Sequence, residues 1–191
     1  LRNRTYTAAN VVLAFGAISY PKVIALPASA QRAKISSALA SAADYTDKSV
    51  LVMGTGPSGM ETAVRLLSRA YNAKHVTLAT RSKSLMFAWN FYINESLWRI
   101  HDFERRGRLT LLLQAALVGA NETHAVLRVA SKSAAKAPAS SSDVEVPADS
   151  IITAVGFTSD EALIRSVGFR DGKVSRDTFE TSMRGVFNVG I

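Results

Sequence analysis

Residues 49–60 read S-V-L-V-M-G-T-G-P-S-G-M, which is the most informative pattern in the chain. Residues 50–53 are a short apolar run with β-branched members, which is typical of a buried parallel strand. The run ends in Gly54-x-Gly56-x-x-Gly59, and an amphipathic helical pattern follows at once. Strand, glycine turn and helix in this order predict a site for the pyrophosphate of a dinucleotide. The alternative is a tight strand–helix turn that binds no ligand.

The residues of the glycine turn have distinct expected roles. Gly54 allows the tight turn, Gly56 lets the backbone approach the pyrophosphate, and Gly59 lets the helix pack closely on the strand. Pro57 suits the first helical position, where its missing N–H costs nothing. The free N–H groups at the helix start, together with Ser58, are expected to face the phosphates.

The segment after the turn completes a β-α-β unit. Apolar residues recur at helical spacing and predict one buried helix face, made of Met60, Ala63, Val64, Leu67, Ala70 and Tyr71. Residues 75–79 then form a second short apolar run. This run predicts a second parallel strand beside the first.

The residues after this second strand indicate the cofactor. In such folds an Asp or Glu about 20 residues beyond the glycine motif binds the ribose 2′-hydroxyl of NAD. Here the strand is followed instead by Thr80-Arg81-Ser82-Lys83. Two cations and two hydroxyls suit a 2′-phosphate, which Arg binds with two parallel hydrogen bonds. The sequence therefore predicts NADP(H), and the alternative is a solvated surface turn.

Composition limits the other classes of function. The chain has 191 residues and a net charge of +8 from 23 basic and 15 acidic residues. The basic residues form no run of five and have no interleaved aromatics, so we expect no nucleic-acid partner. No apolar run approaches the ~20 residues of a membrane span, so we expect no membrane partner.

The chain contains no cysteine. This excludes a dithiol redox pair and a thiolate zinc site within these residues. The three histidines are far apart and lack the spacing of metal ligands, so we expect no metal. The N-terminus resembles the interior of a longer chain, and targeting therefore cannot be read from it.

Further strands and helices are expected along the chain. Strands are predicted over residues 6–15, with Val11, Val12 and Leu13 as their apolar core, over 150–155 ahead of Gly156, at Val174 and over 186–189. An Ala/Ser-rich helix is expected over residues 28–43, followed by a polar turn over 44–48. A second helix is expected over 91–106, ended by Gly107.

Two segments in the second half are expected to form a hairpin and a loop. Residues 109–118 and 122–129 are predicted as strands, joined around Gly119-Ala120-Asn121. Residues 130–143 are rich in Ala, Ser, Lys and Pro and predict a surface loop.

Several of these segments resemble, in the same order, flavoproteins with two dinucleotide-binding domains. That superfamily includes thioredoxin-reductase-like enzymes and flavin-containing monooxygenases. Ala14-Phe15-Gly16 and Ala154-Val155-Gly156 resemble the two A-T-G segments at which such chains cross between their FAD and NADPH domains. Residues 181–190, T-S-M-R-G-V-F-N-V-G, resemble the closing motif T-x-x-x-G-V-F-x-x-G-D.

The resemblance implies an α/β fold: a three-layer, Rossmann-like NAD(P)-binding domain with helices on one face of a parallel sheet and an antiparallel β-meander on the other. It implies that residues 48–152 bind NADPH, and that 1–47 and 153–191 belong to the FAD domain of the same polypeptide. The parent would pass hydride from NADPH to FAD. Gly156 is also expected to contact the cofactor. Glu61 matches the Glu at the helix start in the family, where it would contact the cofactor or have a structural role at the helix dipole. The resemblance supplies no catalytic acid, base or nucleophile, and a homodimer is left open.

Departures from the family pattern keep alternatives open. The family's FAD glycine motif would lie upstream of Leu1, and Ile191 replaces the closing acid. Residues 28–48 lack the Cys-x-x-Cys of thioredoxin reductases. Gly16-x-x-x-Tyr20-Pro21 resembles the monooxygenase branch, whereas 160–190 resemble the reductase branch, including bacillithiol-reductase-like members. One alternative is a binding protein that kept the fold without the chemistry. The other is a stand-alone dehydrogenase, for which Tyr92-x-x-x-Ser96 supplies no site.

Overall fold

The computed structural model describes residues 5–14, 20–26, 34–85, 91–130, 141–158, 174–175 and 177–189, with the backbone alone for 91–94. The chain divides into two compact units. One unit combines Leu1–Pro21 with Phe157–Ile191, and the other is Lys22–Gly156. The assignment of these units to FAD and NADPH stays a prediction.

The unit Lys22–Gly156 is built on a parallel sheet of five strands. Their order is β3 (Ile35–Ser36), β10 (Ser150–Thr153), β4 (Ser49–Met53), β5 (His75–Ala79) and β6 (Leu109–Leu112). In the pairing register, Met53 lies opposite both Thr153 and Ala79. The carboxyl ends of β10, β4 and β5 are therefore level at one edge of the sheet.

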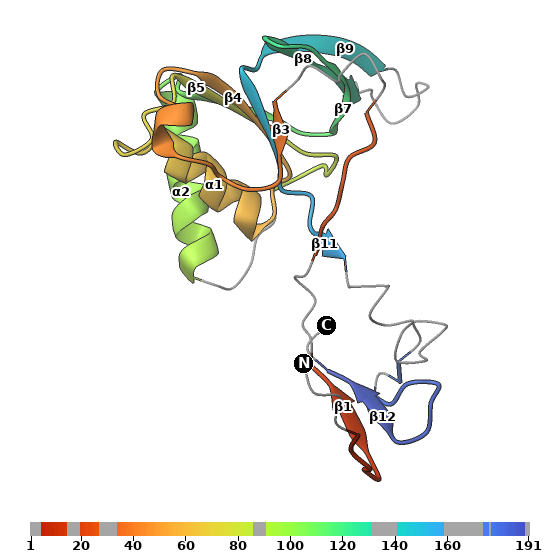
Figure 1. Ribbon diagram of the computed structural model, residues 1–191. Coiled ribbons are helices and arrows are strands. Elements are labelled where there is room, and N and C mark those ends of the chain that lie inside the picture. The colour runs from red at the N-terminus through yellow and green to blue at the C-terminus, as the bar shows by residue number, and fades with distance from the viewer. Residues whose placement is uncertain are drawn as a thin grey trace. The chain divides into compact units, whose positions relative to one another are not determined.

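Two helices cover one face of this sheet (Figure 1). They are α1 (Pro57–Leu67) and α2 (Phe91–Arg105). Because side chains alternate along a strand, every second residue of β4 and β5 points toward these helices. The resulting core cluster includes Val50, Val52, Met60, Ala63, Leu66, Val76, Leu78 and Ile100, all fully buried.

An antiparallel three-stranded meander covers the opposite face (Figure 1). It consists of β7 (Ala115–Ala120), β8 (His124–Ala130) and β9 (Ser141–Pro147). Its apolar side chains pack against the alternate residues of the sheet, in a cluster that includes Leu51, Met53, Ala79, Ala115, Leu127, Val146 and Ile151. The predicted α/β class, with a parallel sheet between helices and a meander, is confirmed.

The predicted strand over residues 109–118 is wrong in one respect. It is two strands, β6 in the parallel sheet and β7 in the meander. The break lies at Gln114, whose φ is 53°. Gln114 is the one polar residue within residues 111–117, and by itself it is too weak a sign to predict the break. Gly119 lies inside β7 at a register shift, and the turn itself is at residues 121–123.

The predicted helix over residues 28–43 is also wrong where the structure describes it. Ile35–Ser36 is strand β3, which pairs with Ile151 and Ile152 of β10, and Ala42–Asp44 is a short 3₁₀ helix. Pairing with a sheet edge overrides the helical propensity of alanine. Residues 28–33 lie outside the described residues, as do 131–140 of the predicted loop.

The loop and helix ends differ slightly from the prediction. Residues 141–143 belong to β9, where Asp143 Oδ1 receives a hydrogen bond from Arg128 Nε over 2.9 Å. Helix α1 ends before Ala70 and Tyr71, which lie in the following turn. The strand over 75–79 and the helix ended by Gly107 are confirmed, and the strand predicted over 150–155 spans Ser150–Thr153.

The other unit contains two strand pairs. Strand β1 (Val11–Leu13) runs parallel to β12 (Val186–Asn188), and β2 (Tyr20–Pro21) runs antiparallel to β11 (Phe157–Thr158). Val11 and Val12, predicted as an apolar core, are 45% and 60% exposed. A two-stranded ribbon buries few side chains by itself, which accounts for this error. Within the described residues, no helix has the length and apolar content to cross a bilayer.

Candidate functional site

The glycine turn forms at the carboxyl end of β4. Gly54 has a φ of +112°, and its N–H donates to the carbonyl of Ala79 over 2.7 Å. A Cβ at this position would overlap the carbonyl group of Ala154, which directly follows the neighbouring strand β10. Both the positive φ and the lack of space require glycine here. The expected tight-turn role of Gly54 is confirmed.

The other two glycines differ from each other. A Cβ on Gly59 would overlap the carbonyl oxygen of Gly54, so glycine here lets α1 pack directly on the end of β4. Gly56 is the N-cap residue, with φ −68° and ψ 176°, and a Cβ there would meet nothing within 4 Å. The fold itself therefore does not require glycine at position 56. Its predicted role toward a pyrophosphate fits this open space.

The start of α1 has unused hydrogen-bond donors. Gly56 provides no side-chain cap, and Pro57 stands at the first position with no N–H. The first helical bond runs from Met60 N to Gly56 O over 3.0 Å. The N–H groups of Ser58 and Gly59 consequently have no acceptor within the helix. Together with the positive end of the helix dipole, they favour an anion at this position.

The predicted 2′-phosphate loop lies at the same edge of the sheet. It follows β5, the direct neighbour of β4, and begins at Thr80. Thr80 is buried, and its hydroxyl accepts the N–H of Ser82 over 3.2 Å. Arg81 and Lys83 are exposed, and neither side chain has an ion pair or hydrogen bond within the described residues. The fold thus brings the glycine turn and two exposed cationic side chains to one edge of the sheet.

Two further predicted residues lie near this edge in different settings. Gly156 has a φ of +97° and follows β10, and its carbonyl accepts the N–H of Lys22 over 2.9 Å. A Cβ at Gly156 would meet nothing within 4 Å, so its conformation is the requirement for glycine. Glu61 is exposed on α1 beyond the first turn.

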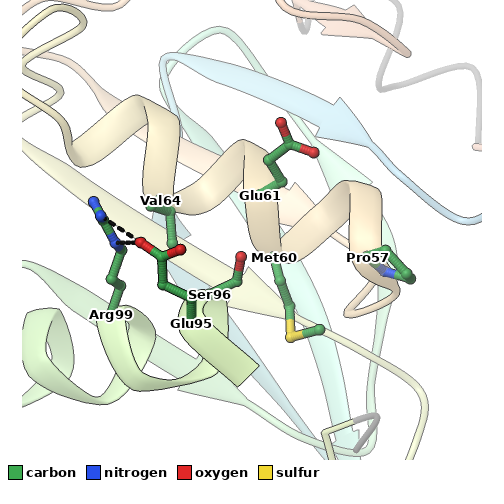
Figure 2. Close-up of a pocket in the computed structure, with 7 residues that line it drawn as sticks. All are labelled: Pro57, Met60, Glu61, Val64, Glu95, Ser96 and Arg99. Carbon is green, nitrogen blue, oxygen red and sulfur yellow. Dashed lines mark hydrogen bonds and ion pairs between the residues drawn. The ribbon is translucent and has the colours of Figure 1, made fainter. Parts of the chain in front are cut away.

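A surface cavity of about 310 Å³ lies between the two helices (Figure 2). Its lining comprises Pro57, Met60, Glu61, Val64, Glu95, Ser96 and Arg99. Arg99 Nη2 lies 2.6 Å from Glu95 Oε1, while the Glu61 carboxylate points away from this pair (Figure 2). A second cavity of about 320 Å³ borders the other side of α1 and includes Ser58 and Arg65. Glu95 and Arg99 were not among the predicted site residues, since an i,i+4 ion pair is common on solvated helices.

Sequence reasoning also missed two backbone contributors to the site. The carbonyl of Ala154 restricts position 54, and the backbone of Gln114 contacts the loop that carries Arg81. Neither contribution depends on a diagnostic side chain. Only the pairing of strands distant in sequence places these groups at the site.

The geometry is that of a Rossmann-like domain whose glycine turn lies at the carboxyl end of β4, where the strand order reverses between β4 and β10. The chain belongs to the pyridine nucleotide-disulphide oxidoreductase family, whose model matches residues 2–190. No curated protein matches the chain.

Solved structures share this fold at low sequence identity. A bacillithiol disulfide reductase from Bacillus cereus has 17% identity and a TM-score of 0.70, over 94% of this chain and 52% of that chain. The enzyme of the same name from Staphylococcus aureus has 15% identity and a TM-score of 0.72, over 94% and 53%. A flavin monooxygenase from Stenotrophomonas maltophilia has 15% identity and a TM-score of 0.65, over 95% and 54%. The chain thus spans about half the length of these structures.

Proposed function

We propose that this chain is the NADPH-binding portion of an FAD-dependent oxidoreductase that passes hydride from NADPH to flavin. One observation carries the proposal: the start of α1, which has no side-chain cap, lies at the same sheet edge as the exposed Arg81 and Lys83, whose side chains have no ion pair or hydrogen bond to the part of the chain that the structure describes. The phosphates of a dinucleotide bind to hydrogen-bond donors, and cationic side chains neutralise their charge. Membership of the pyridine nucleotide-disulphide oxidoreductase family supports the same proposal.

The residues present fit the cofactor. The N–H groups of Ser58 and Gly59 would receive the pyrophosphate, for which the open space at Gly56 leaves room. Arg81 would bind the 2′-phosphate with a bidentate hydrogen bond, and Lys83 would add a more flexible point charge. The FAD domain would be the partner within the same polypeptide. When bound, the flavin would supply the redox chemistry, so this chain's residues bind and orient the nucleotide.

The decisive experiment compares NADPH with NADH. Loss of a charge-assisted hydrogen bond costs about 1.5–3 kcal/mol, or roughly ten- to a hundredfold in affinity. Arg81→Ala is therefore expected to weaken NADPH binding by that factor and leave NADH binding nearly unchanged. Lys83→Ala should have a smaller effect. Calorimetric titration at fixed salt would measure the four dissociation constants of each wild-type and variant pair.

Arg69→Ala is the matched control, because Arg69 is also exposed and lies beyond the opposite end of α1. It removes the same charge and should change neither dissociation constant by more than about twofold. Equal affinity of the wild type for NADPH and NADH would contradict the 2′-phosphate role of Arg81. Anaerobic addition of NADPH to the full-length protein tests hydride transfer, because reduction bleaches the absorbance of its bound flavin. A protein that kept the fold without the chemistry would show no bleaching.

A further inference from the structure

Gln114 has an unusual backbone conformation. Four non-glycine residues with positive φ occur among the described residues: Asp47, Asn72, Gln114 and Phe179. Asn and Asp adopt this region readily, because their short polar side chains bond locally. Gln has no such advantage. Its φ of 53° occurs where the chain leaves the parallel sheet, after β6, and enters the meander at β7.

This conformation connects Gln114 to the loop that carries Arg81. The N–H of Gln114 donates to the carbonyl of Ser82 over 3.0 Å, and the N–H of Ala115 donates to the carbonyl of Thr80 over 2.7 Å. Thr80 in turn donates its N–H to the carbonyl of Leu112 over 2.9 Å. Arg81 therefore lies between two residues whose backbones are both held.

The turn is fixed from its other side as well. The carbonyl of Gln114 accepts the N–H of Ala130, the last residue of β8, over 3.0 Å. Within the loop itself, the N–H of Ser82 donates to the Thr80 hydroxyl. The loop is thus joined to both the parallel sheet and the meander, although Arg81 and Lys83 are solvent-exposed.

A left-handed residue directs its N–H differently from a residue in the helical or extended region. If position 114 left this region, the bonds to Ser82 and Thr80 would not form together. A cationic side chain binds a phosphate more tightly when the backbone of its loop is already held in place, because the loop then loses less conformational freedom on binding. We propose that Gln114 is a positioning residue that, through its left-handed backbone, sets the Arg81 loop for the 2′-phosphate. This inference rests on the proposed function.

The test compares side chains that tolerate positive φ with one that does not. Gln114→Gly removes the cost of positive φ and Gln114→Ala keeps about the cost that glutamine already bears, so both should retain the wild-type ratio of NADPH to NADH affinity. Gln114→Val places a β-branched residue in the left-handed region, where such residues are outliers. We expect this variant to lower the ratio about three- to tenfold, mainly through weaker NADPH binding. Gln114→Thr serves as a milder form if the valine variant does not fold.

Asn72→Val is the matched control. Asn72 also has a positive φ, of 46°, but it precedes β5 and so lies at the opposite edge of the sheet. This variant should lose stability while keeping the affinity ratio. A second measurement needs no nucleotide: hydrogen exchange at the amides of Gln114 and Ala115 should accelerate in Gln114→Val and stay at the wild-type rate in Gln114→Ala.

The outcomes separate this inference from the proposed function. Loss of the ratio in Gln114→Val, with its retention in Gln114→Gly and Asn72→Val, supports the positioning role. A folded Gln114→Val protein that keeps the wild-type ratio, while Arg81→Ala loses it, overturns the inference alone. Equal loss in the glycine and valine variants also overturns it, because the side chain would then be responsible. No NADPH preference in the wild type would refute the proposed 2′-phosphate site itself.

Discussion

Two alanine variants of the glycine turn are expected to have different effects. Gly59→Ala should lower the stability of the fold, and Gly56→Ala should weaken ligand binding. At Gly59 the new Cβ would overlap the carbonyl oxygen of Gly54, which lies in a turn that already requires a φ of +112°. Neither atom can rotate away, because the backbone fixes the position of the Cβ and the carbonyl oxygen is part of the backbone. At Gly56 the Cβ would meet nothing within 4 Å, and the φ of −68° suits alanine.

The magnitudes follow from these contacts. Overpacking costs about 1–3 kcal/mol, and rigid backbone places Gly59→Ala in the upper half of that range. Alanine's better helix propensity offsets up to about 1 kcal/mol, so we expect a net loss of about 1–2 kcal/mol in the free energy of unfolding. For Gly56→Ala, the weaker N-cap and the reduced entropy of the unfolded chain nearly cancel, leaving less than about 0.5 kcal/mol.

Urea denaturation followed by circular dichroism measures the first effect, and NADPH titration measures the second. Gly56→Ala should keep the wild-type urea midpoint and m-value yet bind NADPH at least about tenfold more weakly, since the methyl group would occupy space proposed for the pyrophosphate. A Gly59→Ala protein as stable as the wild type would refute the packing argument. Unchanged NADPH affinity in Gly56→Ala would refute the proposed phosphate position.

Two further predictions concern the opposite edge of the sheet. Arg108 donates from Nη2 to the carbonyl of Ala73 over 2.7 Å and from Nε to that of Lys74 over 3.2 Å, so Arg108→Ala should lower the free energy of unfolding by about 1–2 kcal/mol in urea denaturation. The control Arg105→Ala, whose side chain is 75% exposed, should change it by less than about 0.5 kcal/mol, and equal effects would contradict a special role of Arg108. Burial lowers the pKa of His75 below its ordinary value of 6.5, and the nearby Arg108 charge adds to this, although a backbone hydrogen bond at Gly107 opposes it. The neutral form is therefore favoured in the folded protein, so the stability it contributes is fully present above pH 6.5 and is lost as the pH falls through the lowered pKa. Urea midpoints measured between neutral and acidic pH should fall less steeply in His75→Gln, and an unchanged slope would contradict this assignment.

Local sequence patterns determined the central part of this protein. The run before Gly54, the three glycines, and Pro57 at the first helical position each constrain backbone that lies within a few residues of themselves. A strand, a turn and a helix follow from such short-range constraints because they depend on propensity, on φ and on apolar spacing. The positions of β4, α1 and β5 were therefore predictable, and so was the α/β class.

The sheet that each later strand joins depends on pairing between segments that lie far apart in the sequence. Residues 111–117 are apolar except for Gln114, and at Gln114 the chain passes from the parallel sheet to the meander. Ile35 and Ser36 became a strand because the edge of β10 was available for pairing, against the alanine-rich composition around them. The same pairing places the Ala154 carbonyl against Gly54 and the Gln114 N–H against Ser82. These contacts join backbone groups far apart in sequence, and since every residue carries the same backbone groups, no side-chain pattern records which of them will meet.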